Sequence, residues 1–233
     1  MIPNKYTYLL FDLDHTLWDF NRNCEETLAR LFDKYRLGEL GIYSKKIFFK
    51  EYLQINNKLW SQYNKNELTK EEMREQRFVA LFKQFRISNR KLALQIEDEY
   101  LQECPRNGRL IEGCIEVLDH LAPHYKLVII TNGFEESQRI KMEHSGLAPY
   151  FEHVFTSESV GSKKPSPEYF TFVLNELQAD ASECLVIGDN PQSDILGGNR
   201  AGIDTYWVNT QKFHKRMSST FYADRLTQLK RIL

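Results

Sequence analysis

Two aspartates stand one residue apart, directly after an apolar segment near the start of the chain. The segment 6–11 leads into Asp12 and Asp14. Two neighbouring carboxylates, once buried, disfavour each other's charged form and need compensation. Mg²⁺ can supply it, because this cation prefers carboxylate oxygens as ligands. The alternative interpretation is a solvated strand end, or an aspartate that caps a helix.

Further polar residues follow later segments of the chain. In order they are Thr131, Asn132 and Gly133; then Lys163 and Lys164 before a proline; then Asp189 and Asp194. Thr131 and Asp189 both come at or just after runs of β-branched and other apolar residues, 128–130 and 184–187. Open α/β sheets place their ligand sites at the carboxyl ends of the strands. These residues are therefore expected to share one edge of the sheet, where the carboxylates could bind a divalent cation.

The elements that must position this site alternate along the chain. The pattern predicts strands at 6–11, 126–131, 153–156, 184–188 and 205–208, with helices at 111–121, 135–145, 167–177 and 193–201. Three of the strands lack polar alternation, as expected when helices cover both faces of a sheet. The predicted fold class is therefore α/β, with a Rossmann-like doubly wound parallel sheet.

Residues 19–105 break the alternation, because they contain no convincing strand. They predict consecutive amphipathic helices at 23–35, 44–63, 69–85 and 89–103. Thr69 and Glu72 have the spacing of a capping box at the start of the third. We therefore expect a core formed by residues 1–18 and 106–233, with an all-helical insertion at 19–105. The alternative is a separate helical domain without a catalytic role.

Composition narrows the class of protein and its partners. The chain has 233 residues, 42% of them hydrophobic, and a formal net charge of −1. This charge gives no general attraction to nucleic acid polymers or anionic membranes. The basic run 212–216 is interpreted as a solvated loop. The first residues lack the apolar stretch of a signal peptide, and the four cysteines lack metal-site spacing. A cytoplasmic protein with free thiols is expected.

The four segments, taken in this order, resemble the motifs DxDxT, T/S, K and GDxxxxD of the haloacid dehalogenase (HAD) superfamily. The resemblance covers the whole chain and implies a HAD core with a C1-type helical cap. It also implies a Mg²⁺-dependent phosphomonoester hydrolase with Asp12 as nucleophile, which forms an aspartyl-phosphate. Asp14 would serve as general acid and then general base, and its backbone carbonyl would bind the metal. Thr16 would steady the turn.

The later motifs complete the implied site. Thr131 would bond the transferring phosphoryl group, although an ordinary helix cap also explains this residue. The amides of Asn132 and Gly133 would cradle phosphate oxygens. Lys164 would neutralise the developing charge, with Lys163 as a solvated competitor. The expected metal ligands are Asp12, Asp14 and Asp189, with Asp194 in a supporting position; an aspartate that opens a helix is its alternative explanation.

A closer resemblance bears on the substrate. The segments 130–134, 193–198 and 57–63 are similar to the YjjG-type pyrimidine 5′-nucleotidases. This implies a nucleoside monophosphate as the small-molecule substrate, with Trp18 and Phe20 lining the site entrance. Trp60 and Tyr63 could stack on a base or belong to the core of the cap. Neither the oligomeric state nor the base preference follows from the sequence.

Other functions remain open at this stage. A phosphatase for a small sugar phosphate or phosphoglycolate, or a phosphomutase, would share the four motifs. A 2-haloacid dehalogenase is disfavoured because Asp14, Asp189 and Asp194 are all present. A non-catalytic binding relative is disfavoured because no motif aspartate is missing.

Overall fold

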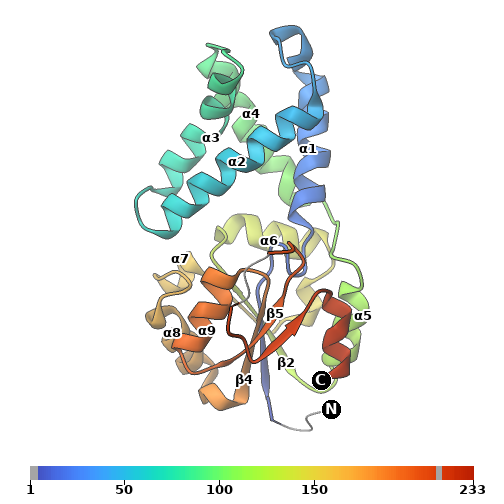
Figure 1. Cartoon of the computed structure of the whole chain (residues 1–233), viewed down its shortest axis with the longest axis vertical. Helices are drawn as coiled ribbons and strands as arrows, with labels where there is room; N and C mark the ends of the chain where they lie inside the picture. Colours follow the sequence, from blue (N-terminus) through green and yellow to red (C-terminus); the bar gives the residue numbers. More distant parts are fainter. Residues whose placement is uncertain (1–4, 214–216) are drawn as a thin grey trace. The chain divides into compact units, whose positions relative to one another are not determined.

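The computed structural model describes residues 5–213 and 217–233 (Figure 1). Residues 1–4, and residues 214–216 of the predicted basic loop, lie outside the described parts. The chain divides into two compact units. One is formed by Met1–Phe20 and Gly108–Leu233 and contains the sheet; the other, Asn21–Asn107, is helical.

The first unit is built on a six-stranded parallel sheet of order β3-β2-β1-β4-β5-β6. Its strands are β1 Tyr8–Phe11, β2 Lys126–Thr131, β3 His153–Thr156, β4 Cys184–Gly188, β5 Asp204–Val208 and β6 Phe221–Ala223. The chain crosses over between parallel strands on both sides of β1, which is the expected pattern of a doubly wound sheet. The predicted fold class is therefore confirmed.

The register of the central strand explains why the polar motif residues meet. Phe11, the last residue of β1, is paired with Ile129 of β2 and Ile187 of β4. The backbone N–H of Asp12 continues the ladder by donating to the Ile187 carbonyl at 2.9 Å. The residues that follow these three neighbouring strands therefore share one edge of the sheet.

Helices cover the sheet on both faces (Figure 1). They are α5 Cys114–Leu121, α6 Glu135–His144, α7 Ser157–Val160, α8 Pro167–Leu177 and α9 Leu196–Arg200. Apolar residues of α8, among them Phe170 and Val173, pack against Leu10, Val128 and Val186 of the three central strands. This side-chain packing fixes the strand ends that carry the polar residues.

Some elements differ from those predicted. The short strand β6 and helix α7 were not predicted, because three or four residues carry too little periodic signal. The helix expected from 111 begins at Cys114, since Gly113 precedes it with φ +76°. The helix expected from 193 starts as a π-helical turn, Pro191–Ile195, before α9.

The helical unit contains α1 Phe20–Lys34, which begins at the end of the first unit, and α2 Lys45–Asn64, α3 Lys70–Gln84 and α4 Arg90–Glu103. The capping box of Thr69 and Glu72 at the start of α3 is confirmed. The rings of Tyr52, Phe78 and Tyr100 lie 5.3–5.7 Å apart between centroids and join α2, α3 and α4. Aromatic contacts of this kind hold the bundle together from within.

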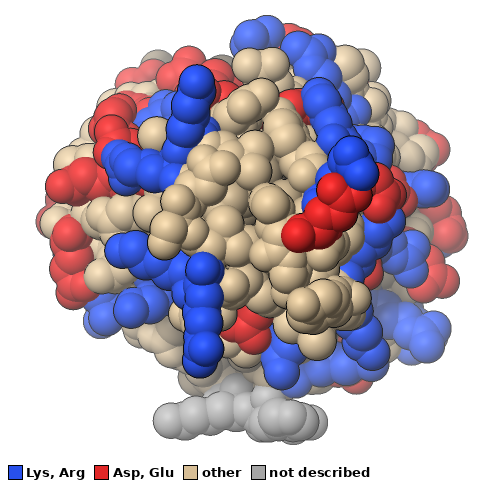
Figure 2. Space-filling model, turned by 90° about the horizontal axis from the view of Figure 1, so that it is seen from above, with Lys and Arg blue, Asp and Glu red and all other residues tan. Residues whose placement is uncertain are grey.

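The surface offers no extended field of one charge on the face seen in Figure 2. Lys and Arg side chains surround an uncharged area there, and acidic side chains stand among them. Within residues 5–213 and 217–233, no helix combines the length and the apolar character that a membrane crossing requires.

Candidate active site

Three buried carboxylates gather where β1 and β4 end. Asp12, Asp189 and Asp194 each offer an oxygen within 4.8 Å of the others. None of the three residues is more than 8% exposed. Gly188 allows the approach of Asp194, because a Cβ at this glycine would lie 2.3 Å from an Asp194 carboxylate oxygen.

A single lysine faces this acidic cluster. The Lys164 ammonium donates to Asp12 at 2.8 Å, to Asp194 at 2.7 Å and to the Ile130 carbonyl at 2.8 Å. These bonds use all three of its N–H donors. Asn132 holds the Lys164 backbone, accepting from its N–H and donating to its carbonyl. The structure thus distinguishes Lys164, which is 1% exposed, from the partly exposed Lys163.

Thr16 belongs to the acidic cluster itself. Its hydroxyl lies 3.2 Å from carboxylate oxygens of both Asp12 and Asp189, and it accepts the Asp189 backbone N–H at 3.0 Å. Gln211 donates to the other oxygen of Asp189. Each carboxylate is therefore held in a fixed orientation by neutral or cationic donors.

The cluster carries more negative than positive charge. Three carboxylates face one ammonium, and burial deprives all of them of solvation. Burial raises the pKa of Asp12 to about 7, against the opposing charge of Lys164, and Asp194 adds to the rise. Burial, together with Asp12 and Asp194, also raises the pKa of Asp189 well above its usual range. A hard divalent cation would compensate this surplus, so the donor set fits Mg²⁺.

The side chain of Asp14 makes a different set of contacts. The Lys141 ammonium donates to its two oxygens at 2.6 and 2.8 Å, and the Gln138 amide donates to one of them at 3.0 Å. Burial alone would raise the pKa of Asp14, but Lys141 outweighs it and holds this pKa below its usual value. The charge of Asp14 is thus compensated within the protein, in contrast with the acidic cluster.

Thr131 connects the two groups of residues. Its hydroxyl accepts hydrogen bonds from the Gln138 amide at 2.8 Å and from the Gly133 backbone N–H at 3.0 Å. The backbone N–H of Thr131 donates to the Tyr169 hydroxyl at 3.0 Å. A Cβ at Gly133 would lie 1.7 Å from the Gln138 amide nitrogen. The absence of a side chain at Gly133 therefore allows Gln138 to reach Thr131 and Asp14.

The two aromatic residues after the first motif differ in exposure. Trp18 is fully buried, and the Lys141 ammonium lies 4.5 Å from its ring centroid. Phe20 is partly exposed, and its ring lies 4.9 Å from that of His15 between centroids, with the planes tilted by 44°. Burial lowers the pKa of His15 to about 4. The Phe20 side chain is therefore accessible to solvent, whereas the buried Trp18 ring packs against the Lys141 ammonium.

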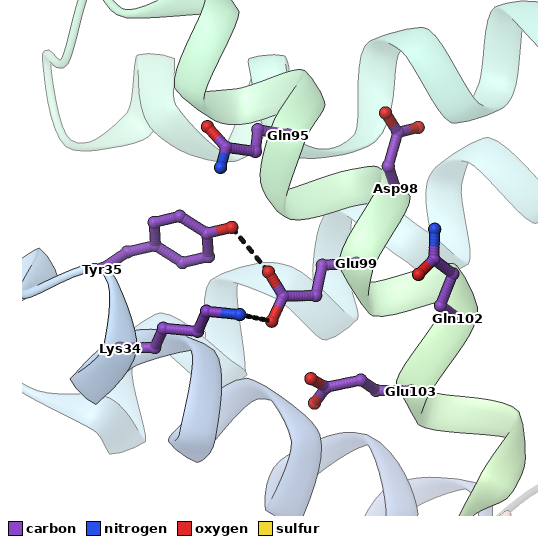
Figure 3. A pocket seen from close by; sticks show the side chains of 7 residues that line it. All are labelled: Lys34, Tyr35, Gln95, Asp98, Glu99, Gln102 and Glu103. Atoms are coloured by element: carbon purple, nitrogen blue, oxygen red, sulfur yellow. Dashed lines mark hydrogen bonds and ion pairs between the residues drawn. The ribbon is translucent and has the colours of Figure 1, made fainter.

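The helical unit has aromatic and polar features of its own. The rings of Trp60 and Tyr63 pack edge to face at 5.5 Å; Tyr63 is 7% exposed and Trp60 is half-buried. Figure 3 shows a shallow hollow between α1 and α4 in which Glu99 accepts hydrogen bonds from Lys34 and Tyr35. These contacts lie within a solvent-exposed polar surface and indicate no catalytic group.

Two residues of the site escaped the sequence analysis. Gln138 and Lys141 stand three residues apart on α6, which follows the second motif. The signal was available: residues at i and i+3 share a helix face, and this helix starts next to the predicted site. The side chains of this polar pair reach Asp14 and Thr131 at the ends of β1 and β2.

Comparison with known proteins agrees with this geometry. The family model of the haloacid dehalogenase-like hydrolases matches residues 6–202. The pyrimidine 5′-nucleotidase PynA of Streptococcus pneumoniae is 34% identical over 206 residues, which are 88% of this chain and 84% of that protein. The pyrimidine 5′-nucleotidase YjjG of Escherichia coli is 28% identical over 232 residues, 98% of each chain.

A solved structure is similar over nearly the whole chain. It is that of the HAD hydrolase YfnB from Bacillus subtilis bound to magnesium, and it is described as revealing interdomain movement. The TM-score is 0.87 at 31% identity, and the match covers 98% of both chains. The likeness includes both the sheet unit and the helical unit.

Proposed function

The chain belongs to the haloacid dehalogenase-like hydrolases, and we propose that it is a phosphatase that hydrolyses nucleoside 5′-monophosphates through an aspartyl-phosphate. The observation that carries the proposal is the buried cluster of Asp12, Asp189 and Asp194 around Lys164, with Asp14 beside it. A nucleophile, a proton-transfer group and a cationic group lie together at the carboxyl edge of the sheet.

In the first step an oxygen of Asp12 attacks phosphorus, and the bond from phosphorus to the ester oxygen breaks. Lys164, already bonded to Asp12, stabilises the negative charge on the phosphoryl oxygens. Asp14 gives its proton to the departing alkoxide, so that an alcohol leaves. The negative phosphate brought by the substrate raises the proton affinity of Asp14 and favours this acid form.

In the second step water attacks the phosphorus of the aspartyl-phosphate, and inorganic phosphate and free Asp12 are released. Asp14 now accepts the proton of that water. Its ion pair with Lys141 favours the carboxylate, which is the form this step requires. The Thr131 hydroxyl accepts hydrogen bonds from Gln138 and Gly133, so its own hydrogen can be donated to a phosphate oxygen just before α6 begins.

Mg²⁺ fits the carboxylate cluster and would be held by Asp12, Asp189 and the Asp14 backbone carbonyl, with Asp194 supporting it through Lys164. When bound it would neutralise charge on the phosphoryl group and lower the barrier to nucleophilic attack. The magnesium-bound state of the similar protein YfnB supports this cofactor.

The substrate class rests on the relatives and on the helical unit. PynA and YjjG are pyrimidine 5′-nucleotidases, and each resembles this chain over most of its length. We propose that the helical insertion expected at 19–105, which the structure forms as the unit Asn21–Asn107, acts as a C1-type cap that selects the base. Aromatic side chains such as Phe20 could add stacking of roughly 1–3 kcal/mol for a flat base. The four cysteines are buried thiols that form no disulfide, which supports a cytoplasmic location.

The test is a comparison of kcat/KM values for purified protein with Mg²⁺. We expect dUMP and dTMP to exceed phosphoglycolate and hexose phosphates by about tenfold or more, given the stacking energy. Asp12→Asn serves as the control for contaminating phosphatases. If phosphoglycolate or a hexose phosphate is preferred by tenfold, the nucleotide assignment is wrong and a small-metabolite phosphatase replaces it.

A further inference from the structure

We propose that Gln138 and Lys141 form a clamp on α6 that fixes the carboxylate of Asp14 for proton transfer in both steps. We call these two residues the α6 clamp. The proposal deepens the function proposed above and rests on it. Neither residue would touch phosphorus, so both are positioning residues that act through Asp14.

The geometry of the contacts leaves the Asp14 carboxylate little freedom to rotate. Lys141 holds both oxygens, and Gln138 holds one of them from a second direction. The two clamp residues are three positions apart on one helix, so they approach Asp14 from the same rigid element. A side chain held by three hydrogen bonds keeps one orientation, and proton transfer needs such an orientation.

Gln138 also connects Asp14 to the phosphate end of the site. Its amide nitrogen donates to Asp14 and to the Thr131 hydroxyl, which defines which end of the amide faces the carboxylate. Its other end, Oε1, is buried and accepts no hydrogen bond from the described residues. Among the described residues, the Gln138 amide is therefore held by its donor end, which faces Asp14 and Thr131.

Lys141 is set apart from an ordinary helix-surface lysine by its surroundings. It is 8% exposed, and its ammonium lies over the face of the buried Trp18 ring. The attraction between the ammonium and the ring face does not depend on the protonation state of Asp14, so it gives Lys141 a second anchor. On the same helix, Arg139 and Glu143 form an exposed ion pair at 2.9 Å, which provides an internal comparison.

The experiment compares Lys141→Met and Gln138→Leu with Arg139→Met, a matched control that removes a cation from the exposed face of α6. Each variant is assayed with an alkyl phosphate, whose leaving group needs a proton, and with 4-nitrophenyl phosphate, whose leaving group does not. We expect kcat for the alkyl ester to fall about 10- to 100-fold in both clamp variants, with KM changed less than threefold. Arg139→Met should match the wild-type protein.

A second readout follows the phosphoryl-enzyme itself. With 4-nitrophenyl phosphate the first step should stay fast in Lys141→Met, while the water-dependent second step slows. We therefore expect one burst of nitrophenolate per enzyme and a protein mass increased by one phosphoryl group after acid quenching. In an Asp14→Asn background, Lys141→Met should lower kcat by less than about twofold, because the clamp then has nothing to position.

Several results would overturn the proposal. One is an equal loss for both substrates without phosphoryl-enzyme, and another is full additivity with Asp14→Asn; each would make the clamp merely structural. If neither clamp variant folds, as judged by thermal unfolding, the two residues are likewise structural and the proposal is wrong. A wild-type protein without activity on any phosphomonoester would remove the proposed function as well, whereas an active wild type with unaffected clamp variants removes the clamp alone.

Discussion

Each compact unit of this protein buries an ion-paired cluster, and the two clusters differ in charge balance. In the sheet unit, Lys164 faces the three carboxylates of the acidic cluster and donates well-formed hydrogen bonds to two of them. In the helical unit, Arg77 of α3 forms an ion pair with Glu97 of α4 at 3.2 Å. The first cluster has a surplus of negative charge, whereas the second is balanced.

The two clusters also differ in hydrogen bonding: the carboxylates of the acidic cluster accept hydrogen bonds, whereas Glu97 accepts none from the described residues. Both carboxylate oxygens of Glu97 are buried and accept no hydrogen bond from the described residues, although Arg77 also reaches Tyr52 and Asn56. A balanced pair between two helices resembles a structural ion pair. A surplus of oriented carboxylates at strand ends indicates a site for a cation and a reacting anion. The comparison teaches that charge balance, more than burial, separates the two.

The largest effect should follow from Asp12→Asn. If Asp12 is the nucleophile, its loss should lower kcat by on the order of 10⁴-fold or more and abolish the acid-stable protein phosphate. Asp33→Asn, at an exposed position on α1, is the matched control and should retain activity. Turnover of Asp12→Asn near the wild-type rate would show that the acidic cluster is not the reacting centre.

The balanced pair should affect stability instead of turnover. Arg77→Met leaves Glu97 buried without its cation, so we expect a loss of roughly 3–5 kcal/mol in the free energy of unfolding. The double variant Arg77→Met, Glu97→Leu should lose less, because both charges are gone. Urea unfolding measures both, and kcat of the folded protein should stay within a few-fold. A double variant no more stable than Arg77→Met would argue against a simple structural pair.

The sequence predicted the parts of the molecule that depend on local pattern. The apolar runs that end just before Asp12, at Thr131 and at Gly188 predicted the strands, and parallel pairing brought their ends together. The clamp residue Lys141 was missed although it shares a helix face with Gln138, because the sequence does not show that this face meets Asp14, 127 positions away. Short elements such as β6 were missed because an edge strand of three residues has no readable period.

The role of Thr16 shows a second limit of pattern. Its position in the first motif was read as structural, and the turn that it occupies does place it between Asp12 and Asp189. Whether a hydroxyl steadies a backbone or bridges two carboxylates depends on the strand register, which the sequence predicts only when both neighbours of β1 are known.

Mg²⁺ should stabilise one unit selectively if it binds the unbalanced cluster. A ligand at a concentration 100 times its Kd adds about 2.7 kcal/mol to the free energy of unfolding. We therefore expect Mg²⁺ to raise the midpoint of thermal unfolding of the wild-type protein, and Asp189→Asn to lose most of that rise. Glu97→Gln should keep it. If Mg²⁺ raised the unfolding midpoint of both variants by the same amount, the metal would not bind at the acidic cluster.

The smallest effect concerns the pH dependence of the balanced pair. Burial raises the pKa of Glu97 from 4.5 to about 7, although Arg77 opposes the rise. A carboxyl with a raised pKa binds its proton more tightly in the folded state, so its contribution to stability is complete below its unfolded pKa. That contribution is lost as the pH rises through the folded pKa. The free energy of unfolding of the wild-type protein should therefore fall by about 2 kcal/mol from this group between roughly pH 5.5 and pH 7.5.

Glu97→Gln isolates that contribution, because glutamine has a similar shape and does not titrate. The difference in unfolding free energy between wild type and variant should change with pH over this interval, in the presence of Mg²⁺ so that the acidic cluster contributes equally to both. A constant difference would mean that Glu97 is fully ionised next to Arg77 at all these pH values. Arg77 and Glu97 would then form a salt bridge with both groups charged. The only difference from the acidic cluster would be the number of carboxylates that face each cation.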